Sequence, residues 1–204
     1  MPITINGSGT LTGISAGGLP DGVITTDDIA ASAVTSAKLA AGAGGKLLQV
    51  VQTVKSDTFS TSTSGSNTFV SITGLSASIT PSSASNKILI QVELGGSGLG
   101  TATTLCSFKV QRASADISGM LGNARTNFFQ ATAGNIRAVA DANGGFRLNM
   151  TYLDSPSSTS SLTYQVLGQA ESSGFCINRT INDSASTNFS ATQISSITLM
   201  EIAP

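Results

Sequence analysis

The C-terminal third of the chain decides the fold, and from Phe146 to Ile202 it reads FRLNMTYLDSPSSTSSLTYQVLGQAESSGFCINRTINDSASTNFSATQISSITLMEI. Its first residues alternate apolar and polar from Phe146 to Tyr152, which is the two-residue period of a strand with one buried face. Similar runs over 162–170, 175–181 and 194–202 predict three further strands, separated by turns rich in Ser, Pro, Gly and Asn. Both faces of the last run are apolar, so we expect that strand to be central in its sheet or covered on both sides.

The sequence upstream of this stretch has the same character from Lys46 onward. We expect strands over 47–54, 69–72, 75–79, 88–94, 105–112 and 136–140, with an irregular segment over 113–130. The run Gly95 to Thr101 lacks the Gly-Lys-Ser/Thr ending of a phosphate-binding loop and precedes no helical pattern, so we expect a plain loop between strands. Many short strands at this spacing predict an all-β fold, a jelly-roll-like β-sandwich.

The composition excludes several classes of function. Charged residues make up 10% of the chain, against about 25% in ordinary globular proteins. The net charge is −1, with no basic run, so nucleic-acid binding has little support. No apolar stretch approaches the roughly 18 residues of a membrane-spanning helix, and the N-terminus lacks the pattern of a secretory signal. We therefore expect no membrane insertion, and folding and assembly in a cytoplasm.

Catalytic chemistry finds few candidates in this sequence. Histidine is absent, which removes the commonest general base and metal ligand. The acidic residues from Lys46 onward are scattered, and the two cysteines have no metal-ligand spacing. We expect no enzyme activity, cofactor or metal site. Cys106 and Cys176 each lie in an expected strand, either as a disulfide or as two small buried side chains.

A ten-residue repeat marks the N-terminal region. ITTDDIAA at 24–31 is matched by VTSAKLAA at 34–41, and each copy carries a Thr suited to capping one helical turn. Such a short unit cannot bury its apolar side alone. The simplest partner for Ile24, Ile29, Val34 and Leu39 is the same segment of other subunits around a symmetry axis. The alternative is a flexible linker with accidental similarity.

Several segments resemble one family. They are PITINGSGT at 2–10, GLPDGVITTDDIA at 18–30, AVTSAKL at 33–39, ITPSS at 79–83 with KILI at 87–90, LDSP at 153–156 with TYQV at 163–166, and ISSITLMEIA at 194–203. Together they resemble the short tail-fibre-like virion proteins of bacteriophages from aquatic hosts. Residues 113–133 depart from that pattern.

The resemblance implies a homotrimer that belongs to the virion. Residues 1–22 would attach it to another phage virion protein, residues 23–45 would form the oligomerising stem, and residues 46–204 would form the β-sandwich head. The expected function is that of a tail fibre whose head recognises the host cell surface. The alternative is a structural virion protein without receptor binding, such as a tail adaptor or capsid decoration.

The non-matching region supplies the candidates for receptor contact. A segment that departs from the family pattern suits a variable, target-reading surface. We expect Arg125, Asn127, Phe128 and Phe129 to contact a glycan or protein of the host surface. The alternative for the two phenylalanines is burial in the core.

Overall fold

The computed structural model describes residues 46–98, 104–137, 145–180 and 192–204, and within the first 45 residues only 25, 27, 29–31, 33–35 and 38. The chain divides into two compact units, Met1–Gly44 and Gly45–Pro204. In the first unit, the Lys38 N–H donates to the Thr35 carbonyl oxygen over 2.9 Å, the spacing of a single helical turn. The second unit holds the fold.

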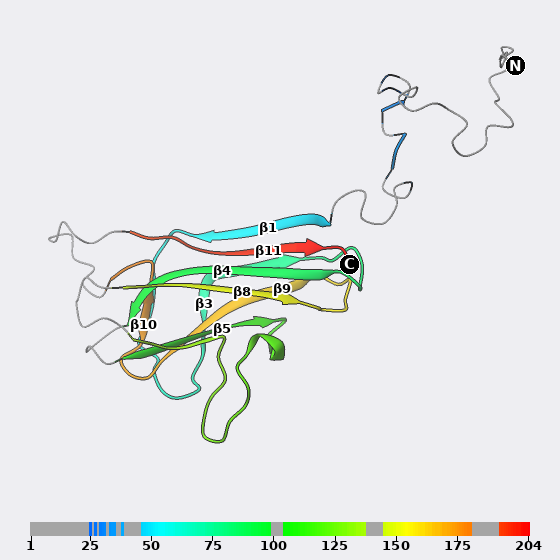
Figure 1. Ribbon diagram of the computed structural model, residues 1–204. Coiled ribbons are helices and arrows are strands. Elements are labelled where there is room, and N and C mark those ends of the chain that lie inside the picture. Colours follow the sequence, from blue (N-terminus) through cyan, green and yellow to red (C-terminus); the bar gives the residue numbers. More distant parts are fainter. Residues whose placement is uncertain are drawn as a thin grey trace, which may run out of the picture. The chain divides into compact units, whose positions relative to one another are not determined.

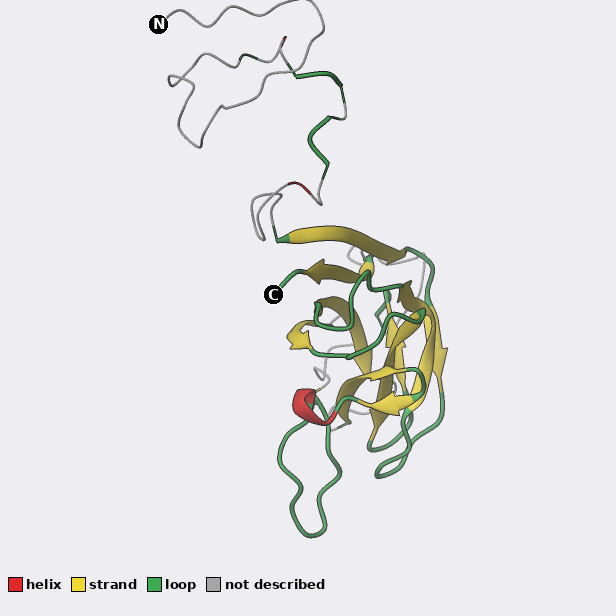
Figure 2. Ribbon diagram, turned by 90° about the vertical axis from the view of Figure 1, so that its right-hand side faces the viewer, coloured by secondary structure: helices red, strands yellow, loops and turns green. Residues whose placement is uncertain are grey.

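Strands dominate the described part of the second unit (Figures 1 and 2). In chain order the elements are β1 (Leu47–Lys55), β2 (Phe59–Thr61), β3 (Val70–Ile79), β4 (Lys87–Gly98), β5 (Leu105–Arg112), β6 (Ala115–Asp116), the 3-10 turn η3 (Ser118–Met120), β7 (Ala133–Arg137), β8 (Phe146–Asp154), β9 (Leu162–Ala170), β10 (Phe175–Ile177) and β11 (Ser195–Ile202). The prediction of an all-β fold is confirmed.

Two antiparallel sheets form the layers of the sandwich. In the first sheet β1, β11, β4 and β8 lie side by side, and β10 continues along the edge of β4 that β11 also uses, followed by β2. In the second sheet β3, β9, β5 and β7 are neighbours, with β6 further along the same edge of β5 as β7. The chain changes sheet at most connections, and its first and last long strands pair with each other. This is the arrangement of a jelly roll.

The core lies between the inward faces of the two sheets, where the alternating apolar side chains meet. Ile88, Ile90, Val92 and Leu94 of β4 are all at most 1% exposed. From the second sheet, the Phe108 ring of β5 contacts the rings of Phe146 in β8 and Phe175 in β10. The two-residue period seen in the sequence therefore marks the buried face of each sheet.

The last strand occupies the position expected from its apolar pattern. β11 lies between β1 and β4, paired with both over most of its length. Ile197 and Leu199 point inward and are fully buried, and Thr198 on the other face is also largely covered. The prediction of a central strand is confirmed.

The expected loop from Gly95 to Thr101 is wrong for its described part, because β4 continues through Gly98. Gly96 pairs with Phe146 of β8 on one side and with Ile177 of β10 on the other. A Cβ at Gly96 would lie 2.3 Å from the Cys176 carbonyl oxygen, so the close approach of β10 requires glycine there. Gly96 therefore lies in a strand with close neighbours on both edges, β8 and β10.

The two short strands expected around Gly74 are one strand, β3, with an irregularity in its pairing to β9 between Ser71 and Ser76. Gly74 has a φ of +81°, which glycine adopts without strain and other residues do not. Because of this bulge, the two halves of β3 pair with β9 in different registers. The expected strand 175–181 is shorter than predicted and ends at Ile177, because Asn178 has a φ of 61°.

Substitution of Gly96 with alanine should destabilise the fold by about 1–3 kcal/mol, the range of an overpacked site. The new methyl group would collide with backbone, which cannot turn aside as a long side chain can. Urea unfolding followed by circular dichroism measures the change. Gly122→Ala is the control, since its nearest neighbour would be 3.9 Å away, and an equal loss in both variants would contradict the explanation.

The cysteines do not form a disulfide. Cys106 and Cys176 both keep their thiols and are fully buried. Burial, with a smaller effect of the nearby Cys176, raises the pKa of the Cys106 thiol to about 12. Cys176 Sγ donates to the Ser97 carbonyl oxygen over 3.5 Å. The interpretation of Cys106 and Cys176 as two small buried side chains is therefore the correct one.

Candidate functional site

The four residues expected to contact a receptor lie in one loop. Residues 121–132 connect η3 to β7 and extend away from the sandwich below β5 (Figures 1 and 2). The loop is anchored at both ends. Gly122 N–H donates to the Ala131 carbonyl oxygen over 3.2 Å, and Thr132 N–H donates to the Phe108 carbonyl oxygen over 3.0 Å. The second sheet therefore fixes the base from which the loop projects.

A tight turn shapes the tip of the loop. Phe128 N–H donates to the Arg125 carbonyl oxygen over 3.1 Å, and Asn127 between them has a φ of 65°, a conformation that asparagine tolerates. The Arg125 guanidinium lies 4.5 Å from the centre of the Phe128 ring. Phe128 is 63% exposed. Core burial is therefore wrong for Phe128, which presents an aromatic face and a cation to solvent.

Phe129 has a different environment. Its ring packs edge-on against Phe69, with ring centres 6.0 Å apart and planes at 75°. Phe69 in turn lies under the Lys109 ammonium, 4.4 Å from its ring centre. Phe129 is half-buried on the outer side of the second sheet and takes no part in the hydrophobic core between the sheets.

Two depressions meet at Phe129. The inner hollow, about 200 Å³ in volume, is lined by Ser66, Leu105, Ser107, Phe129, Asn135, Gln169 and Glu171. The loop hollow, about 340 Å³, is lined by Gly122, Asn123, Phe128, Phe129, Gln130, Ala131, Gly134 and Asn135. Both include Phe129 and Asn135, so the side chains that the loop positions border one continuous surface with the strands β5, β7 and β9.

The inner hollow has a polar floor. Gln169 on β9 is only 3% exposed, and its Oε1 atom accepts no hydrogen bond from any described residue. Ser107 on β5 is 2% exposed, and its Oγ accepts the Asn135 N–H over 3.2 Å. A buried amide oxygen without a partner is costly. The site therefore has hydrogen-bonding capacity that the described chain leaves unused.

The charge of the lining limits what the inner hollow can hold. The Glu171 carboxylate is its one ionisable lining group, and the lining contains no cation. An anionic ligand would meet repulsion without compensation. The volume is below the about 300–1,000 Å³ of pockets for drug-sized ligands. The arrangement suits a neutral, hydroxyl-bearing group of about one ring against the face of Phe129.

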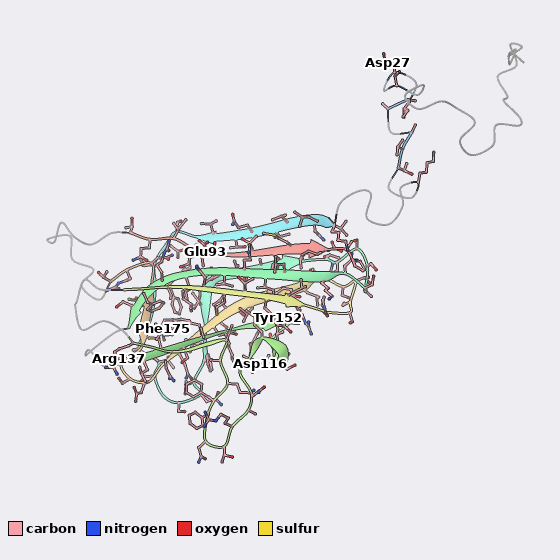
Figure 3. The ribbon with its side chains drawn as sticks, in the orientation of Figure 1. Asp27, Glu93, Asp116, Arg137, Tyr152 and Phe175 are labelled. Atoms are coloured by element: carbon pink, nitrogen blue, oxygen red, sulfur yellow. The ribbon has the colours of Figure 1, made fainter. Side chains whose placement is uncertain are left out.

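A second polar cluster, at the end of the sandwich that carries η3, is satisfied internally. Asp154 is 4% exposed, and its Oδ2 accepts from Arg112 Nη1 at 2.5 Å and from the Tyr164 hydroxyl at 2.7 Å. Burial raises the pKa of Tyr164, and the bond to Asp154 raises it further. Tyr152 and Asp116 border a depression beside this cluster (Figure 3). Its buried groups already have partners, so the cluster stabilises the fold.

The stem residues are described only in part. Ile29 is 42% exposed and Val34 is 50% exposed. Ile24 and Leu39 lie outside the described residues. The homotrimer and the stem interface remain predictions.

Across the described residues, no three His, Cys, Asp or Glu side chains come together as a group able to hold a metal ion. No helix in the described part of the chain has the length and apolar character needed to cross a membrane.

Sequence reasoning missed the floor of the inner hollow. No sequence motif includes the lining residues Ser107, Asn135, Gln169 and Glu171, and the sequence analysis did not predict them as receptor contacts. The available signal was weak: Gln169 is a polar residue on the outward face of a strand, which ordinarily means exposure. Gln169 is buried because residues from other elements surround the inner hollow. The alternation within one strand carries no information about those residues.

Comparisons with known proteins show no family for this chain. No protein-family model matches the chain, and no curated protein matches it. Among solved structures it is similar to one of infectious bursal disease virus, Gx strain, with 14% identity over 76% of this chain and 42% of that chain and a TM-score of 0.38. A structure of the Gt strain of the same virus has 11% identity, the same coverage and the same TM-score. This chain spans less than half the length of either viral chain, and likeness at this level supports no statement about function.

Proposed function

We propose that this chain is a structural protein of a bacteriophage virion, a homotrimeric tail fibre attached by its N-terminus to another virion protein. Its head recognises the host cell surface through the face that carries Arg125, Asn127, Phe128 and Phe129. Support comes from the sequence resemblance at both ends of the chain, the ten-residue repeat, and the jelly-roll head. The protein performs no catalytic step in this proposal and needs no cofactor.

One observation carries the recognition role. The loop 121–132 holds Phe128 in solvent at the loop hollow, and this hollow meets, at Phe129, the inner hollow lined by Gln169, whose buried Oε1 has no described partner. An exposed aromatic ring next to unused hydrogen-bonding groups is the combination that binding surfaces require. A neutral sugar of the host surface supplies the matching chemistry, with an apolar ring face for Phe129 and hydroxyls for Gln169 and Ser107.

Three heads on one particle would strengthen such a contact. A single shallow site binds weakly, but copies held on one axis raise the effective concentration without new contacts. Low affinity at one hollow is therefore compatible with firm attachment of a phage.

Phe128→Ala should weaken host binding about tenfold, because truncating an exposed aromatic anchor removes a contact of the kind that dominates interfaces. The assay measures how well purified full-length protein blocks phage adsorption to host cells. Gln169→Leu, which keeps the volume and removes the amide, should weaken blocking similarly. Thr151→Ala, on the outer face of the other sheet, is the matched control.

Two results would contradict the proposal. Unchanged phage adsorption in the presence of saturating wild-type protein would favour the role of adaptor or capsid decoration. Equal blocking by wild type, Phe128→Ala and Gln169→Leu would remove the assigned face from recognition while leaving the fibre role in place.

A further inference from the structure

Four apolar residues lie side by side across the outer face of the first sheet, whereas the inner hollow and the loop hollow lie on the second sheet. Val50 of β1 is opposite Met200 of β11, Met200 is opposite Leu89 of β4, and Leu89 is opposite Leu153 of β8. Val50 is 53% exposed and Leu153 is 42% exposed. These four residues are the apolar row, which crosses the sheet from edge to edge.

The neighbouring row shows that this pattern is local. Gln52, Thr198, Gln91 and Thr151 lie two residues further along the same four strands, paired in the same way. All four are polar, and Gln52 Nε2 donates to Thr198 Oγ1 over 2.9 Å. A solvated outer face is polar in this way. The apolar row departs from it on every strand at once.

The edge strand that carries Val50, β1, also has an unpaired outer edge. β1 pairs with β11 and with no other described strand, so its second edge carries unpaired backbone groups. Three of its outward side chains, Leu48, Val50 and Val54, are 47%, 53% and 49% exposed. A long edge strand with exposed apolar residues invites association, and native proteins usually cover it.

The chemistry of the row favours another copy of the same chain as its cover. The row contains no charge and no hydrogen-bonding group, so it offers nothing to discriminate a polar or charged partner. Interfaces between identical subunits are more apolar than other interfaces. β1 begins at Leu47, three residues after the first unit ends at Gly44. Copies joined through their first units would therefore present this row at high effective concentration.

We infer that the apolar row and the adjoining edge of β1 are covered by a second copy of this chain. The inference rests on the proposed homotrimer, and it adds an interface between heads to the one expected in the stem. It assigns assembly to the first sheet and leaves the second sheet free for recognition.

Val50→Glu with Leu153→Glu in full-length protein tests the interface. Charges at both ends of the row should raise the concentration at half-dissociation at least tenfold, measured by light scattering over a dilution series. Gln52→Glu with Thr151→Glu adds the same charges to the same strands two residues away and should leave the oligomer intact. Both variants should fold, because the substituted side chains are exposed. Circular dichroism checks this.

The outcomes separate this inference from the proposed function. A row variant that dissociates no more readily than its control would overturn the interface, with the stem trimer still in place. A wild-type protein that is monomeric at all concentrations would overturn both.

A thiol at Val50 identifies the occupant directly. Both native cysteines are buried, so Val50→Cys adds an accessible thiol that a short bismaleimide can join to one on another copy. Covalent dimers on a denaturing gel would support the inference. Protection of that thiol that persists when the protein is diluted to monomers would overturn it, because a segment of the same chain would then be the cover.

Discussion

Glu201→Ala should lower the free energy of unfolding by about 3 kcal/mol, because four donors lose one buried acceptor. Glu201 is 1% exposed at the end of β11. Its Oε1 accepts from the Ser82 N–H at 2.6 Å, the Ser82 hydroxyl at 2.8 Å and Asn86 Nδ2 at 2.5 Å. Its Oε2 accepts from Gln49 Nε2 at 2.5 Å. The carboxylate thus ties the turn between β3 and β4 to β1 and β11.

The same residue gives a dependence on pH with a definite sign. Burial alone would raise the pKa of the Glu201 carboxyl, but the hydrogen bonds from Asn86, Gln49 and Ser82 outweigh it and lower the pKa from 4.5 to about 2. The folded protein therefore binds this proton more weakly than the unfolded chain. The stabilisation is fully present above pH 4.5 and is lost as the pH falls toward 2.

Urea unfolding at several pH values measures both effects. Glu201→Gln keeps the shape and removes the charge, so its deficit relative to wild type should shrink as the pH falls from 4.5 to 2. Glu93→Ala, at an exposed carboxylate on the outer face of β4 (Figure 3), is the control and should change stability by less than about 0.5 kcal/mol. A deficit for Glu201→Gln that stays constant over this range would contradict the assignment.

Local alternation was enough to place most of the fold. The strands expected over 105–112 and 162–170 coincide with β5 and β9. Apolar and polar residues alternate from Cys106 to Gln111 and from Leu162 to Val166, and the pattern depends only on which face of the strand is buried. The central place of β11 followed in the same way, because apolar residues on both faces report cover on both faces.

Features that depend on distant partners could not be predicted. The sequence from Gly95 to Gly98 looks like a loop because glycine weakens strands. The glycines are needed there because β10, about eighty residues away in the sequence, approaches β4 closely. Phe128 and Phe129 are adjacent and identical, yet one is exposed and the other packs on Phe69. No local pattern distinguishes them. The residues of the inner hollow were missed for the same reason.

The two sheets differ in what their outer faces offer. The first presents the apolar row and an unpaired edge, and the second presents the hollows under the loop 121–132. A sandwich buries one face of each sheet and leaves two faces on opposite sides. Under the proposed function, this geometry would allow one face to be used for assembly while the other remains accessible to a host.

Phe108→Ala should be the most damaging single truncation considered for the core, costing about 3–5 kcal/mol. Phe108 is fully buried, and its ring meets Phe175 at 5.6 Å and 86° and Phe146 at 5.3 Å and 49°. These rings come from β5, β10 and β8, so one side chain joins both sheets. Gly168 accommodates the cluster, since a Cβ there would lie 2.6 Å from Phe175 and 2.7 Å from Phe108.

Thermal and urea unfolding of Phe108→Ala measure this loss, and Phe128→Ala supplies the comparison. The second truncation removes the same atoms from a ring that is 63% exposed and touches the Arg125 side chain, so its cost should stay below about 1 kcal/mol. The same chemical change should therefore unfold the head at one position and spare it at the other. Comparable losses at both positions would mean that the Phe108 cluster does not hold the two sheets together.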